Sequence, residues 1–380
     1  MTTSPSPPNP VRPRAESRGP APSGLSPRSA TRGALQLVGL RKTYGNHDAV
    51  AGLDLDIAPG EFFTLLGPSG CGKTTTLMML AGFVEPTAGT VRIDGRDVAD
   101  VRPEDREIGV VFQNYALFPH LTVAENLAFP LQMRRLPARE IRERVDRVLD
   151  LVQLGGEAGK YPAALSGGQQ QRVAVARAIV FDPPVLLMDE PLGALDRKLR
   201  VRLQTELRQL QRELGVTVVY VTHDQDEAMS MSDRIAVMQA GRVAQVGTPR
   251  ELYESPSSLF VADFLGRNNA LPAVSAGPGK ARLQSGHVLD TATHDVPDGA
   301  PCTVVVRPER TRLVATGGIP ARVTDAVFLG ATTEYVLDVT GLGILRSVVL
   351  HDGATPDPAV GDSVEVLLNP SDVRVFADPS

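Results

Sequence analysis

Short, continuous apolar runs recur along the first two thirds of the chain, and stretches of helical periodicity separate them. A run of this kind is typical of a parallel strand that is buried on both faces of a sheet. Strands that alternate with helices predict an α/β fold with a parallel sheet. The runs lie at Phe62–Leu66, Gly109–Phe112, Val185–Met188 and Val216–Thr222.

Three stretches show the spacing of an amphipathic helix. The first should stop at Gly82. The second should open at Pro137 and end at the Gly155-Gly156 pair, and the third should run from Asp196 to Gly215. Their apolar stripes are Leu77, Leu80 and Ala81; Ile141, Val145, Val148, Leu149 and Val152; and Leu199, Leu203, Leu207, Leu210 and Leu214.

Two further units are predicted to be antiparallel. Leu35–Leu40, Val50–Ile57 and Thr90–Ile93 look like a small, largely antiparallel sheet, with a turn at Tyr44-Gly45 between the first two strands. The stretch Arg234–Val246 predicts a hairpin that turns at Gly241.

The last third of the chain is predicted to be all-β after an amphipathic helix around Leu259–Leu265. Five short alternating runs suggest a small OB-like barrel, and residues 275–300 show little pattern. The expected domains are a disordered tail (1–33), an α/β domain (34–245) with a helical subdomain at about 114–165, a linker (246–270) and a β domain (271–380). The five runs are Cys302–Val306, Ala321–Phe328, Glu334–Val339, Ile344–Val349 and Ser363–Leu368.

Composition excludes several classes of protein. The 380 residues suggest two or three domains, and 42% hydrophobic with 22% charged residues is typical of soluble globular proteins. A net charge of −5 and a pI near 5.8 argue against a nucleic-acid partner. No apolar run approaches the length of about 20 residues that a membrane-spanning helix needs, and we expect no secretory signal. The two cysteines are too few for a disulfide framework and favour the reducing cytosol.

A phosphate-binding loop is the clearest chemical motif. Gly67–Thr74 fits the pattern G-x-x-x-x-G-K-[ST] and lies between a predicted strand and a predicted helix. There, free backbone N–H groups and the helix dipole converge on an anion, Lys73 supplies a positive charge, and Thr74 offers a hydroxyl to Mg²⁺. The chain is therefore expected to bind a nucleoside triphosphate. The predicted contacts are Gly67, Pro68, Ser69, Gly70, Cys71, Gly72, Lys73, Thr74 and Thr75.

Three predicted strands end in polar side chains. Gln113, the Asp189-Glu190 pair and His223 each follow an apolar run, and the carboxyl ends of parallel strands are where such sheets bind ligands. Asp189 would serve Mg²⁺ and Glu190 would polarise an attacking water. Taken singly, Gln113 fits a surface residue, the two acids fit a solvated strand edge, and His223 fits a structural histidine.

A second anion site is suggested by the stretch from Leu165 to Gln169. Ser166 and Gln169 have the spacing of a capping box that heads a helix through Val173–Ile179. An ordinary capped helix does not explain Gly167 and Gly168, because glycine disfavours a first helical turn. Two glycines leave the first N–H groups of that helix unobstructed.

Together these motifs resemble, in their order along the chain, an ATP-binding cassette. Gly67–Thr74, Gln113, Leu165–Gln169, Asp189-Glu190, Pro191–Asp196 and His223 look like its Walker A, Q-loop, signature, Walker B, D-loop and switch histidine. The resemblance spans roughly residues 35–245. It implies a P-loop NTPase fold with a RecA-like core, an antiparallel β subdomain and a helical subdomain. Gly193 departs from the serine that is common in the D-loop.

The later motifs are similar to the importer branch that carries C-terminal TOBE domains. They are the stretch from Thr222 to Ala228, Gly247-Thr248-Pro249 and Val306-Arg307-Pro308-Glu309. The resemblance implies a homodimer in which Ser166 and Gly168 of one copy close over ATP held by Lys73 of the other. It further implies that Tyr44 stacks on adenine, although packing on a sheet edge is the safer interpretation from the residues alone.

The roles implied by the resemblance complete the expected site. Glu190, His223, Lys73 and Gln113 would be catalytic, Thr74, Gln113 and Asp189 would hold Mg²⁺, and Asp196 would belong to the D-loop. Leu165, Ser166, Gly167, Gly168 and Gln169 would act in trans. Cys71 would be either an alkylation-sensitive thiol or, as we favour, a small packing residue.

The implied partners are two integral-membrane permease subunits, with a solute-binding protein reached only indirectly. The ATPase would then be peripheral, on the cytoplasmic face of the plasma membrane. Polyamines such as spermidine or putrescine are the first expectation for the solute, and ferric iron, thiamine, phosphonate or sugar are alternatives. A soluble, non-transport cassette protein and an exporter are the competing classes.

Overall fold

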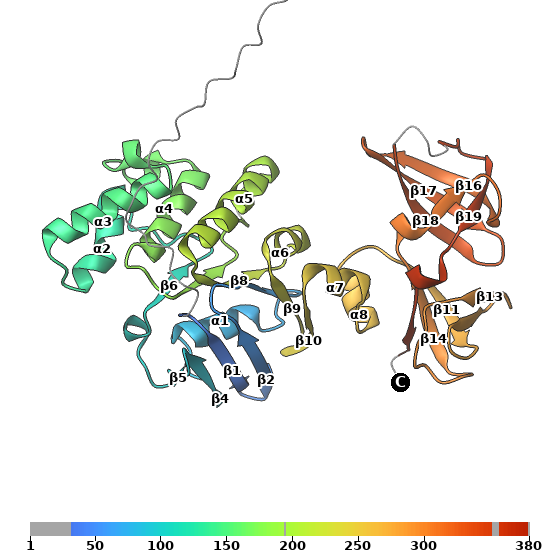
Figure 1. Ribbon diagram of the computed structural model, residues 1–380, viewed down its shortest axis with the longest axis horizontal. Helices are drawn as coiled ribbons and strands as arrows, with labels where there is room; N and C mark the ends of the chain where they lie inside the picture. The colour runs from blue at the N-terminus through green and yellow to red at the C-terminus, as the bar shows by residue number, and fades with distance from the viewer. Residues whose placement is uncertain (1–31, 194, 352–356, 379–380) are drawn as a thin grey trace, which may run out of the picture.

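The computed structural model describes residues 32–193, 195–351 and 357–378. The predicted N-terminal tail lies outside these ranges apart from Arg32 and Gly33. The described chain has an N-terminal α/β part and a C-terminal all-β part, with two short helices between them (Figure 1).

A six-stranded sheet forms the centre of the N-terminal part, in the order β10-β9-β3-β8-β7-β6. Five of these strands are parallel, and β10 pairs antiparallel with β9. Every residue of β3, β7 and β8 is buried, which explains their continuous apolar composition. The strands are β3 (Phe62–Leu66), β6 (Ile108–Val111), β7 (Val185–Asp189), β8 (Thr217–Thr222), β9 (Arg234–Gln239) and β10 (Arg242–Gly247).

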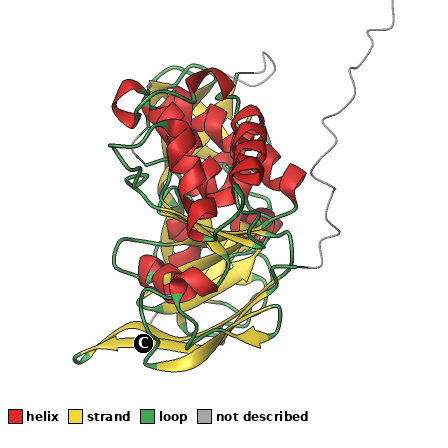
Figure 2. Cartoon of the chain, turned by 90° about the vertical axis from the view of Figure 1, so that its left-hand side faces the viewer, coloured by secondary structure: helices red, strands yellow, loops and turns green. Residues whose placement is uncertain are grey.

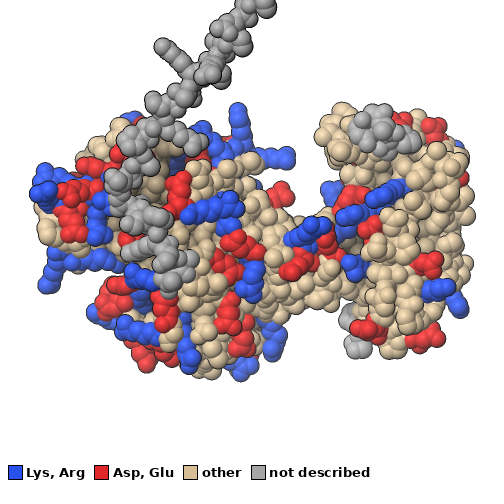
Figure 3. All heavy atoms as spheres, viewed as in Figure 1, with Lys and Arg blue, Asp and Glu red and all other residues tan. Residues whose placement is uncertain are grey.

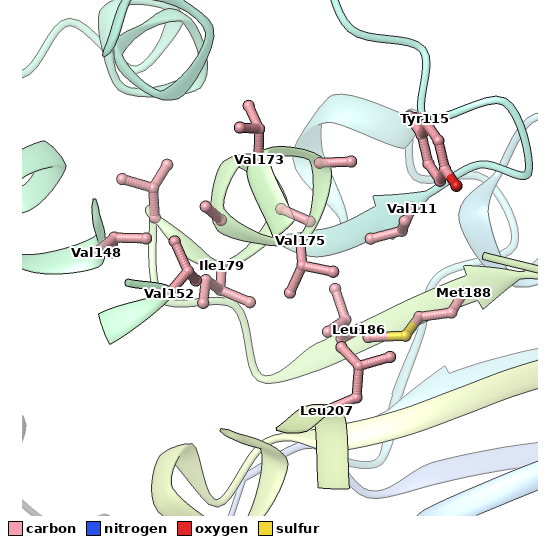
Figure 4. Packing of buried hydrophobic residues seen from close by; sticks show 14 of the residues in the cluster. Val111, Tyr115, Val148, Val152, Val173, Val175, Ile179, Leu186, Met188 and Leu207 are labelled. Carbon is pink, nitrogen blue, oxygen red and sulfur yellow. The ribbon is translucent and has the colours of Figure 1, made fainter. Parts of the chain in front are cut away.

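Helices cover this sheet and form a separate helical lobe (Figures 1 and 2). Apolar side chains of the lobe and of the sheet join in one buried cluster, in which Val175 lies near Leu186 (Figure 4). The predicted helical segment therefore shares its core with the strands that end at the site. The helices are α1 (Lys73–Ala81), α2 (Val123–Met133), α3 (Ala138–Leu151), α4 (Gly167–Ile179), α5 (Arg197–Leu214) and α6 (Gln225–Met231).

The predicted antiparallel sheet is confirmed, with one strand more than expected. Its order is β2-β1-β4-β5, and the turn between β1 and β2 lies at Gly45 and Asn46. The predicted hairpin is also confirmed, because β9 and β10 turn at Ala240 and Gly241. The strands of the small sheet are β1 (Leu35–Tyr44), β2 (His47–Ile57), β4 (Ala88–Ile93) and β5 (Arg96–Asp97).

The C-terminal part is all-β, as expected, but it holds more strands than the sequence suggested. Two five-stranded antiparallel sheets have the orders β13-β12-β11-β14-β20 and β15-β19-β16-β17-β18. Residues 275–300, which showed little pattern, contribute β12 and β13. The strands are β11 (Asn269–Ser275), β12 (Lys280–Leu283), β13 (Val288–Asp290), β14 (Pro301–Val306), β15 (Arg312–Val314), β16 (Ile319–Phe328), β17 (Thr332–Val339), β18 (Gly343–Leu350), β19 (Ser363–Leu367) and β20 (Val373–Ala377).

Two helices connect the parts. The expected helix is α8 (Leu259–Phe264), and it is preceded by α7 (Pro249–Glu254), which we did not predict. Thr248 caps α7 in a capping box with Glu251, so the sequence carried a start signal at this point. Five short 3₁₀ helices complete the described elements: η1 (Pro103–Asp105), η2 (Gly155–Glu157), η3 (Pro162–Ala164), η4 (Pro308–Arg310) and η5 (Pro370–Asp372).

The end of α3 was predicted wrongly. The helix ends at Leu151, and Gln153 adopts a left-handed conformation with φ of 59°. The N–H of Leu154 then bonds the carbonyl of Leu149 at 2.8 Å. This arrangement is a Schellman motif in which glutamine takes the left-handed position that glycine usually occupies. The Gly155-Gly156 pair is therefore not needed to end the helix.

Gly109 lets helix α4 approach strand β6 directly. A Cβ at this position would lie 2.4 Å from the carbonyl oxygen of Ala178 and 2.9 Å from a methyl of Leu186. Gly109→Ala should therefore destabilise the protein by about 1–3 kcal/mol, because the helix or the strand must shift. A melting temperature several degrees lower in differential scanning calorimetry is the expected result.

Gly156→Ala is the matched control for this substitution. A Cβ there meets nothing within 4 Å, and the backbone does not have a positive φ. The melting temperature should stay the same or rise slightly. Equal melting temperatures for the two variants would contradict the close packing of α4 on β6.

Candidate functional site

The loop between β3 and α1 is held tightly by its neighbours. Gly72 has a φ of 102°, and a Cβ there would lie 2.3 Å from the carbonyl oxygen of Ala49. At Gly67 a Cβ would lie 2.5 Å from the carbonyl oxygen of Met238. Because β2 and β9 supply these carbonyls, the sheets on both sides fix the loop, and glycine is required at both positions.

Lys73 folds back onto its own loop. Its ammonium donates to the carbonyls of Gly67 and Pro68 at 2.7 and 3.0 Å, and the side chain is 5% exposed. Among the described residues no partner accepts from the backbone N–H groups of Gly70 or Gly72. The loop therefore offers unpaired donors and a nearby positive charge, which is the chemistry that a polyphosphate chain requires.

Glu190 is the meeting point of the predicted strand-tip residues. The Gln113 amide donates to Glu190 Oε2 at 3.3 Å, and His223 Nδ1 lies 3.0 Å from Glu190 Oε1. Glu190 has a φ of 44°, which is uncommon for any residue but glycine, and its N–H donates to the carbonyl of Val221 at 3.0 Å. The turn after β7 thus aims this carboxylate between the neighbouring strand ends.

Asp189 lies beside the phosphate loop. The Thr74 hydroxyl donates to Asp189 Oδ1 at 3.2 Å. Burial raises the pKa of Asp189, and the charge of Glu190 raises it further against the opposing effects of Thr74 and Lys73. A bound cation would instead lower the pKa of Asp189, because an added positive charge favours the ionised carboxylate.

The oxygen atoms of Thr74 and Asp189 are suitable for Mg²⁺. This ion prefers oxygen ligands and is commonly held by one or two protein groups together with phosphate oxygens and water. Within the described ranges no group of three or more His, Cys, Asp or Glu side chains could hold a metal without such help. The residues therefore fit a metal that arrives with a nucleotide.

The signature stretch forms the predicted capped helix. Ser166 and Gln169 make both bonds of a capping box at the start of α4. A Cβ on Gly168 would lie 3.1 Å from a methyl of Leu199, so this glycine also allows close packing on α5. Whether Ser166 and Gly168 meet Lys73 of a second copy stays a prediction.

The remaining predicted residues lie around this centre. Tyr44 is 52% exposed at the end of β1, and the Lys42 ammonium lies 5.1 Å from the centre of its ring. Asp196 caps α5 by accepting from the N–H of Leu199 at 3.0 Å. Cys71 is 3% exposed, and burial raises the pKa of its thiol, which agrees with a small packing residue.

Arg177 is a residue of this region that the sequence analysis missed. From α4 it donates to the carbonyls of Tyr115 and Ala116 at 2.9 and 2.7 Å. Both residues have a positive φ, 61° and 46°, and follow shortly after Gln113. Arg177 thereby stabilises a strained turn next to a site residue. Its place in a helical pattern gave no sign of this contact.

Glu227 is a second residue that was missed. It is 2% exposed and accepts hydrogen bonds from the hydroxyls of Tyr220 and Thr222, both at 2.8 Å. Burial raises its pKa, and Arg200 lies 3.8 Å away. These bonds fasten α6 to the end of β8, so they hold the turn that carries His223.

Two sequence families match parts of the chain. The ABC transporter family matches residues 50–193, and the TOBE domain matches residues 304–376. The N-terminal match contains the phosphate loop, Gln113, the signature and the Asp189-Glu190 pair. These matches and the solved structures below support the expected cassette fold followed by a β-rich TOBE domain.

Curated relatives cover most of the chain. The spermidine/putrescine import ATP-binding protein PotA of Acidothermus cellulolyticus is 52% identical over 338 residues, covering 84% of this chain and 87% of the relative. The Fe(3+) ions import ATP-binding protein FbpC of Brucella abortus is 48% identical over 314 residues, covering 80% of this chain and 88% of the relative.

Solved structures match the N-terminal part. The cbiO1 protein of Clostridium perfringens, part of the ABC transporter complex cbiONQ, superposes with a TM-score of 0.55 at 33% identity, covering 58% of this chain and 90% of the other. A dimeric ATP-binding cassette in a post-hydrolysis state with ADP and Pi superposes with a TM-score of 0.51 at 36% identity, covering 57% and 99%.

The buried position of Cys71 predicts slow alkylation. Because burial raises its pKa, less thiolate is present at neutral pH than for a free cysteine, and the rate should climb only as the pH approaches the raised pKa. Iodoacetamide should modify Cys71 at least about tenfold more slowly in the native protein than in urea, as measured by peptide mass spectrometry. Equal rates in the two states would mean that the thiol is accessible.

Proposed function

The chain belongs to the ABC transporter family and is the ATP-hydrolysing subunit of an importer; from this premise we propose that a homodimer of it drives polyamine uptake through two separate permease subunits. Among the residues that the structure describes, no helix is long and apolar enough to span a bilayer. The permeases would therefore supply the membrane path. In our proposal the ATPase is peripheral, on the cytoplasmic face of the plasma membrane.

The proposed reaction is in-line attack of water on the γ-phosphate of ATP. The observation that carries it is the contact of both Gln113 and His223 with the Glu190 carboxylate. Glu190 would accept a hydrogen bond from the water and polarise it, while the two neighbours fix the direction of the carboxylate. His223 would also sense the phosphate that is released.

Lys73 would exchange partners when the nucleotide binds. Its ammonium would leave the carbonyls of Gly67 and Pro68 and contact the β- and γ-phosphates, while the free N–H groups of the loop contact the remaining oxygens. Thr74, Asp189 and Gln113 would hold Mg²⁺, which when bound offsets charge on the phosphates. These groups together stabilise the charge that develops in the transition state.

Each site would be completed by a second copy of the chain. The capped start of α4 carries Ser166, Gly167 and Gly168, and its first N–H groups have no partner within a helix. This helix end suits the γ-phosphate of ATP bound to the other copy. The dimeric cassette with ADP and Pi, at 36% identity, supports this arrangement.

A polyamine is the solute that the relatives favour. The relative with 52% identity is named for spermidine and putrescine import, and the one with 48% identity is named for Fe(3+) ions. Ferric iron is therefore the second candidate. The solute passes through the permease and is delivered to it by a solute-binding protein, so both of these proteins, and not the ATPase, would select it.

Glu190→Gln should lower the rate of ATP hydrolysis by about 10²- to 10⁴-fold, because an amide cannot take part in proton transfer from water. The variant should still bind ATP, since Lys73 and the loop are intact. Phosphate release gives the rate, and equilibrium binding of a fluorescent ATP analogue gives the affinity.

Glu143→Gln is the control for this variant, because it makes the same change in an exposed ion pair with Arg139 on α3. Hydrolysis should stay at the level of the unchanged protein. An unchanged rate in the Glu190 variant would remove this carboxylate from the mechanism.

Deletion of the gene should abolish high-affinity uptake of radiolabelled spermidine by cells. The unchanged protein should restore uptake, and the Glu190→Gln variant should not, because transport depends on hydrolysis. Loss of ferric iron uptake with normal spermidine uptake would instead identify the second candidate solute.

A further inference from the structure

A cavity of about 200 Å³ lies where the C-terminal part meets the two connecting helices. Its wall comes from α7, α8 and the residues that follow them on one side, and from β14, η4, η5 and β20 on the other. Positively and negatively charged side chains gather where the α/β part and the C-terminal part meet, a region that we call the waist (Figure 3). Three arginines line the cavity: Arg307, Arg310 and Arg374.

Arg307 is buried with incomplete hydrogen bonding. It is 9% exposed, its guanidinium lies 4.2 Å from the centre of the Tyr253 ring, and a Cβ on Gly266 would lie 2.6 Å from its Nη1. Nη1 donates to the carbonyl of Arg267 at the long distance of 3.5 Å, and Nη2 finds no partner among the described residues. A buried guanidinium of this kind requires an acceptor.

Arg310 and Arg374 also have fewer hydrogen-bond acceptors than N–H donors. Arg310 Nη1 lies 3.8 Å from Asp372 Oδ1, which is too far for a hydrogen bond. Arg374 donates to the carbonyl of Glu254 at 2.9 Å, a neutral acceptor. Each guanidinium carries five N–H donors, so most donors of these side chains remain available.

The carboxylates around the cavity do not compensate the arginines fully. Glu254 and Asp372 line it, but both oxygens of Glu254 accept from Arg250 at 3.0 Å. Glu309 accepts from the Tyr253 hydroxyl instead of from an arginine. With Arg250 counted, four arginines and three carboxylates leave an excess of one positive charge, which favours an anion.

The cavity also calls for a ligand that can donate a hydrogen bond. Asn268 lines the cavity, and its amide nitrogen donates to Asp263 Oδ1 at 2.8 Å, while its own Oδ1 is buried without a partner. A carboxylate or sulfate could accept from the arginines but could not donate to Asn268. Monohydrogen phosphate and a singly protonated phosphate monoester can do both.

We propose that this cavity is a binding site for a phosphate group, either free phosphate or a small phosphate monoester. The guanidinium N–H groups of Arg307 and Arg310 donate to its oxygens, and its P–OH group donates to Asn268 Oδ1. The ligand contacts residues on both sides of the waist, so its binding ties the C-terminal part to α7. It is separate from the phosphate loop, which binds ATP.

Isothermal titration calorimetry tests the site on the full chain in phosphate- and sulfate-free buffer. The protein is first saturated with Mg²⁺ and a non-hydrolysable ATP analogue, so that the phosphate loop is filled. Inorganic phosphate and glycerol 3-phosphate are then titrated separately. We expect saturable binding of one ligand per chain, and the tighter of the two ligands identifies free phosphate or a monoester as the natural class.

Arg310→Gln should weaken binding at least about tenfold, because a charge-assisted bond is lost. Arg307→Lys, which keeps the charge but not the fork, should weaken it as well. The control is Arg312→Gln, an equal change of charge at an exposed position outside the cavity, which should bind like the unchanged protein. Melting temperatures confirm that each variant is folded.

Absence of saturable binding to the unchanged protein would overturn the proposal. It would also fail if folded Arg310→Gln bound as tightly as the unchanged protein, or if Arg312→Gln lost binding to the same degree. These outcomes concern the cavity alone, because the phosphate loop is occupied throughout.

Discussion

The parallel pairing of β6, β7, β8 and β3 is the constraint on which the site depends. Because parallel strands end at the same edge of a sheet, this pairing brings Gln113, Asp189, Glu190 and His223 next to the phosphate loop. A shift of one residue in any pair would turn those side chains away. Fully buried strands resist such shifts, since each would leave polar backbone groups unpaired in the core.

Backbone strain is concentrated beside the reacting groups. Glu190, Tyr115 and Ala116 are non-glycine residues with positive φ, which costs on the order of 1–3 kcal/mol each. The bond from the Glu190 N–H to Val221 and the bonds from Arg177 to the other two residues stabilise these conformations. The core of the α/β part thus supports a carboxylate direction that the local sequence would not adopt alone.

Much of this arrangement could be predicted from the sequence because its signals are local. The apolar runs marked the buried strands, and Ser166 and Gln169 marked the start of α4. The polar residues after each run marked the strand tips. The features that we missed or predicted wrongly depend on contacts between distant segments or on residues that are unusual at their positions. Gln153 replaces the glycine of a helix end, Arg177 acts on carbonyls far away in the chain, and β12 and β13 lack an alternating pattern strong enough to read.

The contact between Arg177 and the turn at Tyr115 and Ala116 has a mechanical consequence. Arg177 lies on α4, the same helix whose first turn carries Ser166 and Gly168. α4 is one continuous helix of 13 residues, so its regular hydrogen bonds fix its first turn relative to its last. Through Arg177, α4 is hydrogen-bonded to the carbonyls of Tyr115 and Ala116, which follow shortly after Gln113. The Gln113 amide in turn donates to Glu190. A continuous series of contacts therefore joins α4, through the Arg177 guanidinium, to the segment whose Gln113 amide donates to the Glu190 carboxylate of the same chain.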